Sequence, residues 1–189
     1  MQRRFHYEQA FEHYLRANRV PYVAVDEAKK SLLPAGGAQQ TIKSFDFLVS
    51  APDRSLLVDI KGRRCAGRLR EGRRLENWVT KEDIDGLSTW SRLFGDAFEP
   101  LFIFAYGCDQ QPPDGLFEEV FPFGERWYGL REVSLRAYQQ HMQPRSARWA
   151  TVNIPAREFQ RIARPFSLRD RPAAGCQGRM RQVPKGCPV

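Results

Sequence analysis

The chain has 189 residues, 42% apolar and 28% charged, a length and balance typical of one folded domain with its own core. A net charge of +8 favours a polyanionic partner. No stretch approaches the about 18 apolar residues of a membrane span, and the N-terminus lacks a signal-peptide core. The four cysteines lack Cys-x-x-Cys spacing. We therefore do not expect a membrane, secreted or zinc-binding protein. We expect a protein of the reducing cytoplasm with free cysteines.

The first predicted element is an amphipathic helix over residues 5–18. Its apolar side chains recur at helical spacing and form one stripe, which consists of Tyr7, Ala10, Phe11, Tyr14 and Leu15. A first strand is expected over residues 21–25. Residues 26–41 contain Pro and paired Gly, which predict a loop with room for one helical turn over residues 28–33.

Two short apolar strands follow, over residues 45–50 and 56–61, joined by a turn. Period-2 alternation places Asp59 and Lys61 on one side of the second strand and the flanking aliphatic residues on the other. A hairpin brings Asp46 of the first strand beside that pair. Two carboxylates and an ammonium therefore converge among apolar strands.

This cluster of charges predicts a metal site. Burying two carboxylates together is costly unless a cation compensates them. Mg²⁺ meets this need, because it takes hard oxygens from Asp side chains and backbone carbonyls. Lys61 would then hold, or help to deprotonate, a metal-bound water near a scissile phosphate. The alternative is an edge-strand salt bridge between Asp59 and Lys61, with Asp46 solvated in a turn.

An Arg-dense run follows the second strand. Six arginines occur in 12 residues, opposed by Glu71: Arg63, Arg64, Arg68, Arg70, Arg73 and Arg74. Because the run begins two residues after Lys61, we expect it to contact the backbone of a nucleic acid. A solvated charged face is the alternative.

The middle of the chain predicts a parallel crossover. Thr80 and Asp83 form a capping-box pattern that begins a helix over residues 80–94, and Gly95 ends it. A continuously apolar strand follows over residues 101–106. Strand, helix and apolar strand in this order favour a right-handed parallel connection. The predicted fold class is α/β, a mixed sheet with helices on its faces.

The remaining third of the chain predicts a hairpin, a helix, a strand and a final helix, over residues 117–123 with 126–133, 134–142, 149–154 and 155–164. Trp127, Tyr128 and Trp149 are assigned to the core, with base stacking as the alternative. Basic residues among Gly and Pro predict a disordered tail over residues 166–189, which leaves 1–165 as the folded domain.

An Asp on one strand followed by Asp/Glu-x-Lys on the next, here Asp46 and Asp59-Ile60-Lys61, resembles the PD-(D/E)XK nuclease superfamily. The helix around Glu8 is similar to the opening helix of small Holliday-junction-resolvase-like endonucleases. The resemblance covers about residues 5–64. The second acid is Asp rather than Glu, Phe45 stands where some members have Pro, and the Gln-x-x-x-Tyr element of RecB-like members is absent. The resolvase-like and restriction-like branches stay open.

The resemblance implies a restriction-endonuclease-like fold and a metal-dependent endonuclease. Asp46 and Asp59 would ligate Mg²⁺, with Mn²⁺ as the expected substitute, and the Ile60 carbonyl would complete the protein ligands. Lys61 would orient the attacking water. Glu8 would support the metal or its water.

Several choices stay open from the sequence. Glu12 competes with Glu8, because both lie on the opening helix. DNA is the expected substrate because the resolvase-like relatives act on DNA, and a structure-specific RNA nuclease is the alternative. A catalytically inert nucleic-acid-binding module of the same fold is the alternative from another class. A homodimer is compatible with the sequence.

Overall fold

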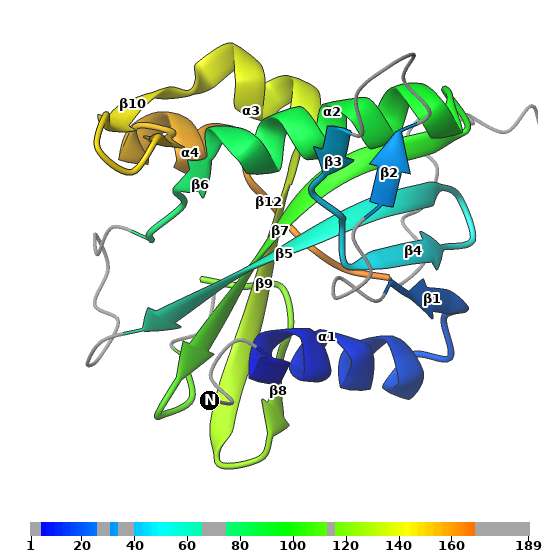
Figure 1. Ribbon diagram of the computed structural model, residues 1–189. Coiled ribbons are helices and arrows are strands. Elements are labelled where there is room, and N and C mark those ends of the chain that lie inside the picture. Colours follow the sequence, from blue (N-terminus) through cyan, green and yellow to red (C-terminus); the bar gives the residue numbers. More distant parts are fainter. Residues whose placement is uncertain (1–4, 26–30, 34–39, 66–74, 113–115, 169–189) are drawn as a thin grey trace, which may run out of the picture.

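The structure is a computed structural model that describes residues 5–25, 31–33, 40–65, 75–112 and 116–168 (Figure 1). These residues form an α/β protein. Its helices are α1 (Phe5–Ala17), α2 (Lys81–Phe94), α3 (Leu135–His141) and α4 (Ala156–Ile162). The four predicted helices over residues 5–18, 80–94, 134–142 and 155–164 therefore all form, within two residues of their expected ends.

The centre of the described molecule is a seven-stranded mixed sheet, in the order β1-β4-β5-β7-β9-β12, with β8 paired to β9. Its strands are β1 (Tyr22–Ala24), β4 (Phe47–Ser50), β5 (Ser55–Cys65), β7 (Phe98–Cys108), β8 (Val120–Phe123), β9 (Arg126–Ser134) and β12 (Arg164–Pro165). The long strands β5 and β7 pair in parallel, and the other neighbours pair antiparallel. The predicted mixed sheet flanked by helices, with a parallel crossover through α2, is confirmed.

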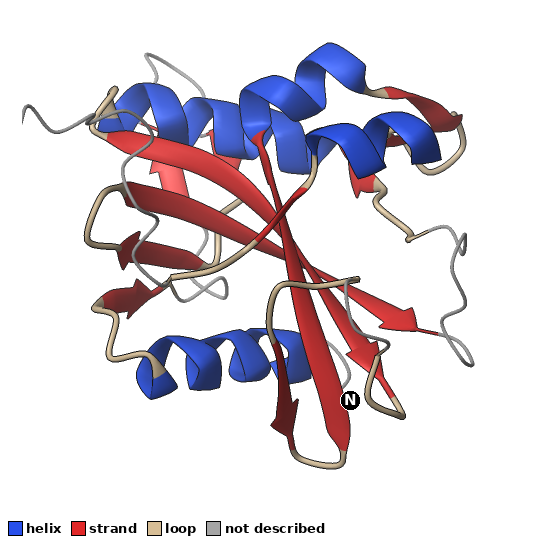
Figure 2. Ribbon diagram, turned by 180° about the vertical axis from the view of Figure 1, so that it is seen from behind, coloured by secondary structure: helices blue, strands red, loops and turns tan. Residues whose placement is uncertain are grey.

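The helices cover both faces of this sheet (Figures 1 and 2). Helix α1 lies alone on one face, where its Phe11 and Leu15 belong to the same buried cluster as Val58 of β5 and Ile103 of β7. Helices α2, α3 and α4 lie on the other face, over a second core cluster. Alternate residues of β5 point to opposite faces, so the strand belongs to both cores.

Two smaller sheets flank the central one. Strands β10 (Gln143–Ser146), β11 (Thr151–Asn153) and β6 (Val79–Thr80) form a three-stranded sheet, and β2 (Ser31–Leu33) pairs with β3 (Gln40–Ile42). The prediction of a loop over residues 26–41 is wrong for residues 31–33 and 40–41, because these segments belong to two strands that pair with each other. Residues 31–33, where a helical turn over residues 28–33 was allowed for, form a strand instead. Strand β10 has no counterpart in the sequence-based prediction.

The folded part of the chain reaches beyond residue 165. Phe166 is buried, and its ring packs against those of Phe11 and Tyr14. The predicted tail boundary at residue 166 is therefore too early, because Phe166 and Ser167 are buried, and residues 169–189 of the predicted tail lie outside the described residues. In the described part of the chain, no helix is long and apolar enough to cross a membrane.

The three aromatic residues assigned to the core separate in the structure. Tyr128 is buried and Trp127 packs against the core, as predicted. For Trp149 the core assignment is wrong, because its side chain is 68% exposed. It lies in the turn before β11 rather than within the strand.

Candidate active site

The candidate site lies along an edge of β5 that β4 leaves open. The β4–β5 register ends with Phe47 opposite Val58, whereas β7 follows β5 as far as Cys65. Asp46 immediately precedes β4. Its backbone N–H donates to the Val58 carbonyl at 2.9 Å, and its carboxylate accepts the Ile60 N–H. Asp46 therefore takes the place of a further strand residue and directs its carboxylate toward this edge.

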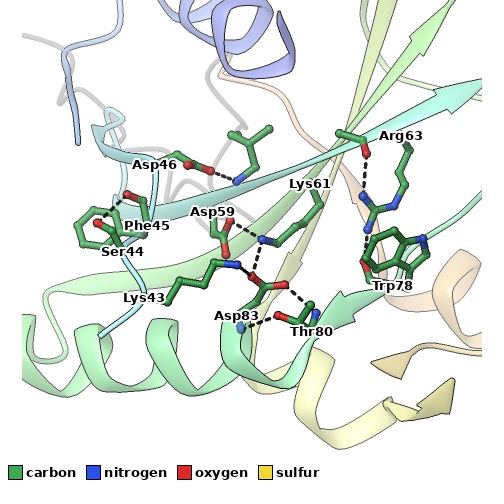
Figure 3. Close-up of polar contacts among 12 residues, drawn as sticks. Lys43, Ser44, Phe45, Asp46, Asp59, Lys61, Arg63, Trp78, Thr80 and Asp83 are labelled. Atoms are coloured by element: carbon green, nitrogen blue, oxygen red, sulfur yellow. Dashed lines mark hydrogen bonds and ion pairs between the residues drawn. The ribbon is translucent and has the colours of Figure 1, made fainter. Parts of the chain in front are cut away.

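Lys61 links two carboxylates that come from different elements (Figure 3). Its Nζ lies 2.8 Å from Asp59 Oδ1 on the same strand and 3.0 Å from Asp83 Oδ1 on α2. Lys43 forms a second ion pair with Asp83. Asp83 also accepts the Thr80 N–H at 2.7 Å, which completes the capping box of α2. Asp59 and Asp83 thus share the buried ammonium of Lys61, and Asp83 has more polar partners than Asp59.

These charged groups line a cavity of about 480 Å³. Among its lining residues are Glu8, Asp46, Asp59, Ile60, Lys61 and Asp83. The structure thus brings together on one cavity the acids and the lysine that the sequence singles out. Glu12 lies elsewhere, where its carboxylate contacts Arg16 and the Tyr22 hydroxyl.

Burial and the shared lysine separate the pKa values of the two carboxylates. Burial raises the pKa of Asp59, with a smaller opposing effect from Lys61. Burial also opposes ionisation of Asp83, but Lys61, Lys43 and the Thr80 N–H outweigh it and hold the pKa of Asp83 well below its usual value. For Lys61, burial acts to lower the pKa, yet Asp59 and Asp83 together raise it well above the ordinary value. Lys61 is therefore a cation and a poor proton acceptor.

The oxygen donors on the cavity wall suit a hard divalent cation. Asp46 and Asp59 supply carboxylates. The Ile60 N–H points to Asp46, and in a β-strand the N–H and C=O of one residue point to the same side, so the Ile60 carbonyl lies at this edge as well. Within the described residues, no group of three or more His, Cys, Asp or Glu side chains is arranged to hold a metal ion. Instead, Asp59 and Asp83 are arranged around the ammonium of Lys61.

The structure corrects the placement of Arg63. The sequence groups it with exposed phosphate-binding arginines, but the residue is only 7% exposed. Its guanidinium lies 4.1 Å from the centre of the Trp78 ring and donates to the Gly62 and Trp78 carbonyls. Arg63 points to the same side of β5 as Asp59 and Lys61, and it lines the cavity together with Trp78 (Figure 3).

Arg64 is the exposed arginine of the run within the described residues. Its side chain pairs with Asp109 at 3.2 Å. It also borders a second hollow of about 570 Å³, which adjoins the candidate site through Tyr7. The other predicted contacts, Arg68, Arg70, Arg73 and Arg74, lie outside the described residues.

Helix α1 is held against β5 by close packing next to Lys61. A Cβ at Gly62 would lie 2.1 Å from a ring carbon of Tyr7, so glycine is required for this approach. The ring of Tyr7 also contacts Gly107 on β7. Since Glu8 follows Tyr7, this contact sets where the helix presents its acid to the cavity.

Sequence reasoning missed Asp83, Lys43 and Trp78 as parts of the site. The signal for Asp83 was present, because the capping box identified it, but only as the start of a helix. The crossover from β5 to β7 places the N-terminus of α2 over Lys61, and no local pattern states that. Lys43 and Trp78 have no sequence signal, since both reach the cavity from irregular segments.

The fold and the site together define an α/β protein with a buried acid–lysine cluster at an open strand edge. No protein-family model matches the chain, and neither does any curated protein. Among solved structures, the fold is similar to that of Archaeoglobus fulgidus Hjc, a Holliday junction resolvase from an archaeal hyperthermophile. The TM-score is 0.47 at 12% sequence identity, over 84% of this chain and 93% of that chain.

Proposed function

We propose that the chain is a metal-dependent endonuclease that hydrolyses phosphodiester bonds in nucleic acid, with DNA as its substrate. The observation that carries the proposal is the convergence of Asp46, just before β4, with Asp59 and Lys61 of β5 on one cavity that Glu8 also lines. The sequence resemblance to PD-(D/E)XK nucleases rests on the same four residues and supports the same chemistry.

Each residue of the site has a distinct role in this proposal. Asp46, Asp59 and the Ile60 carbonyl would hold Mg²⁺ or Mn²⁺, which when bound would polarise the phosphate and supply a reactive water. Lys61 stays charged, so it orients that water and stabilises negative charge developing on the phosphate rather than accepting a proton. Asp83 and Lys43 hold Lys61 and its neighbours in place. Glu8 would receive a hydrogen bond from a metal-bound water.

One observation favours a second candidate, an inert nucleic-acid-binding module. In the described part of the chain the carboxylates surround a lysine, and no three ligating side chains surround a metal position. Cleavage and metal binding therefore have to be measured separately.

The deciding experiment combines cleavage with thermal unfolding. Wild type is incubated with supercoiled plasmid and with branched DNA, in Mg²⁺, in Mn²⁺ and in chelator. We expect cleavage with either metal and none with chelator. Because a ligand bound only by the folded state stabilises it, Mg²⁺ should also raise the melting temperature.

Asp59→Asn should abolish both the cleavage and the metal-dependent rise in melting temperature. The fold should persist, because burial already favours the neutral form of this side chain. Asp53→Asn is the matched control, since Asp53 is an exposed acid in the turn before β5. An unchanged rise in the Asp59→Asn variant would place any bound metal elsewhere. If wild type binds DNA but cleaves no DNA or RNA, the protein is an inert nucleic-acid-binding module rather than a nuclease.

A further inference from the structure

The turn between β10 and β11 presents the indole of Trp149 to solvent. At 68% exposure it is the most exposed of the large apolar side chains in the described residues. Its surroundings are exposed too, because every residue from 143 to 150 except Ser146 has an exposed side chain. A large aromatic ring with one face open to water is typical of a recognition surface.

Several hydrogen bonds support this turn. The Trp149 N–H donates to Ser146 Oγ at 3.4 Å, and the Ala150 N–H donates to the Ala147 carbonyl at 3.2 Å. Ala150 has φ 44°, a left-handed conformation that costs a non-glycine residue energy. The Lys81 N–H donates to the Ala150 carbonyl at 2.9 Å. The ring is therefore presented on a fixed support.

The same contacts join the turn to the candidate active site. Strand β11 pairs with β6, with Thr151 opposite Thr80, and Thr80 lines the cavity next to Asp83. In this small sheet β11 lies between β10 and β6, and β6 leads directly into α2 (Figure 1). A groove of about 610 Å³ lies alongside, and Trp78 lines both the groove and the cavity.

The groove and the turn carry mainly positive charge. Arg145 and Arg157 line the groove, and the Arg148 guanidinium lies 5.2 Å from the centre of the Trp149 ring. Residues 142–157 contain no acid. Glu76 is the acid on the groove wall. This charge is complementary to a polyanion, and arginine beside an aromatic ring suits a phosphate next to a base.

Resting on the proposed nuclease function, we propose that this groove binds the DNA strand that leaves the active site and that Trp149 stacks on an unpaired base of it. In a continuous duplex the faces of the bases are covered by their neighbours, so a fixed indole has nothing to stack on. The substrate class is therefore DNA with unpaired nucleotides close to the scissile phosphate, such as a single-stranded flap, rather than continuous duplex.

The test compares binding of two DNAs of the same sequence, a continuous duplex and a duplex with a short single-stranded flap. Dissociation constants are measured in chelator, so that binding is separated from cleavage. Wild type should prefer the flap, and Trp149→Ala should reduce this preference about tenfold, the effect of one lost base stack. Trp149→Phe should retain most of the preference. A 2-aminopurine in the flap should change its fluorescence with wild type and not with Trp149→Ala.

Leu93→Ala is the matched control, because Leu93 is another exposed apolar side chain, 56% exposed, near the opposite end of α2. It should bind both DNAs as wild type does. The inference is overturned if Trp149→Ala keeps the wild-type preference, or if it weakens binding to both DNAs equally.

Cleavage by wild type in Mg²⁺ and in Mn²⁺, measured on the same two DNAs, separates this inference from the proposed function. Cleavage together with an unchanged preference in Trp149→Ala overturns the inference and leaves the nuclease. A Trp149-dependent preference without cleavage in either metal overturns the nuclease and leaves the binding surface. If wild type binds neither DNA, both proposals are wrong.

Discussion

Two buried groups of charges lie on the central sheet and differ in how completely the protein satisfies them. At the start of β5, Arg54 binds Glu132 through two parallel contacts, Nη1–Oε1 at 3.2 Å and Nη2–Oε2 at 2.7 Å. Glu99 lies 3.5 Å from the same guanidinium. The fork of Arg54 and the carboxylate of Glu132 match each other, which is the strongest geometry for such a pair.

At the open edge of β5 the charges are shared rather than matched. Lys61 serves Asp59 and Asp83 at once, Lys43 adds to Asp83, and the group faces a cavity. The pKa of Asp59 is raised and that of Asp83 is lowered, because Asp83 has more cationic and N–H partners than Asp59. The matched pair is thus satisfied within the fold, whereas the shared group borders a cavity, where a ligand could reach it.

The largest effect is expected from Lys61→Ala, which breaks the shared group. Cleavage should fall by roughly 10²–10⁴, typical of a lost proton-handling or water-orienting group. The metal-dependent rise in melting temperature should persist, since an ammonium is not a metal ligand, and DNA affinity should fall only modestly. Lys81→Ala, an exposed lysine at the start of α2, is the control. Loss of metal binding in Lys61→Ala would contradict the assigned role.

Breaking the matched pair should affect stability instead. Glu132→Gln leaves the half-buried Arg54 without its carboxylate, and we expect a loss of about 3 kcal/mol in the free energy of unfolding, at the lower limit for a buried pair. Denaturant unfolding measures it, and cleavage per folded molecule should not change. Glu158→Gln, which removes an exposed pair with Arg161, should cost much less. A specific loss of cleavage in Glu132→Gln would remove the distinction between the two groups.

Gly62→Ala tests whether the packing of α1 sets the open edge. The new Cβ would overlap the ring of Tyr7, and the helix that carries Glu8 would have to shift. We expect a loss of about 1–2 kcal/mol in the free energy of unfolding, modest for overpacking because Tyr7 is only half-buried. Cleavage should fall as well. In a chain that already carries Tyr7→Ala, the ring is gone, so Gly62→Ala should cost little further stability. A full loss of stability in that background would contradict this mechanism.

The smallest effect is expected at the exposed rim of the site. Arg64→Gln should weaken binding to all DNAs alike and reduce the salt dependence of binding by about one counterion, because one phosphate contact is lost. Titrations at several salt concentrations measure this slope. Arg16→Gln removes an equally exposed arginine at the far end of α1 and should leave the slope unchanged. Equal slopes for Arg64→Gln and wild type would show that the rim does not contact phosphate.

Much of the fold was predictable because its signals are local. The apolar stripe of α1, the alternation in β4 and β5 and the capping box at Thr80 each depend on residues a few positions apart. The parallel crossover followed from the order of these elements and their handedness. The pairing of residues 31–33 with 40–42 was missed, because a Gly- and Pro-containing stretch gives no periodic signal.

Within the candidate site, the sequence by itself determined that Asp46, Asp59 and Lys61 share one side of a hairpin, since alternation along two strands and a short turn suffice for that. Only the tertiary structure decided that Asp83 joins them, that Arg63 is buried against Trp78 and that Trp149 is exposed in the turn before β11. Each of these depends on contacts between segments far apart in the chain, where packing, and not the spacing of neighbours, sets which side chain meets water and which meets another charge.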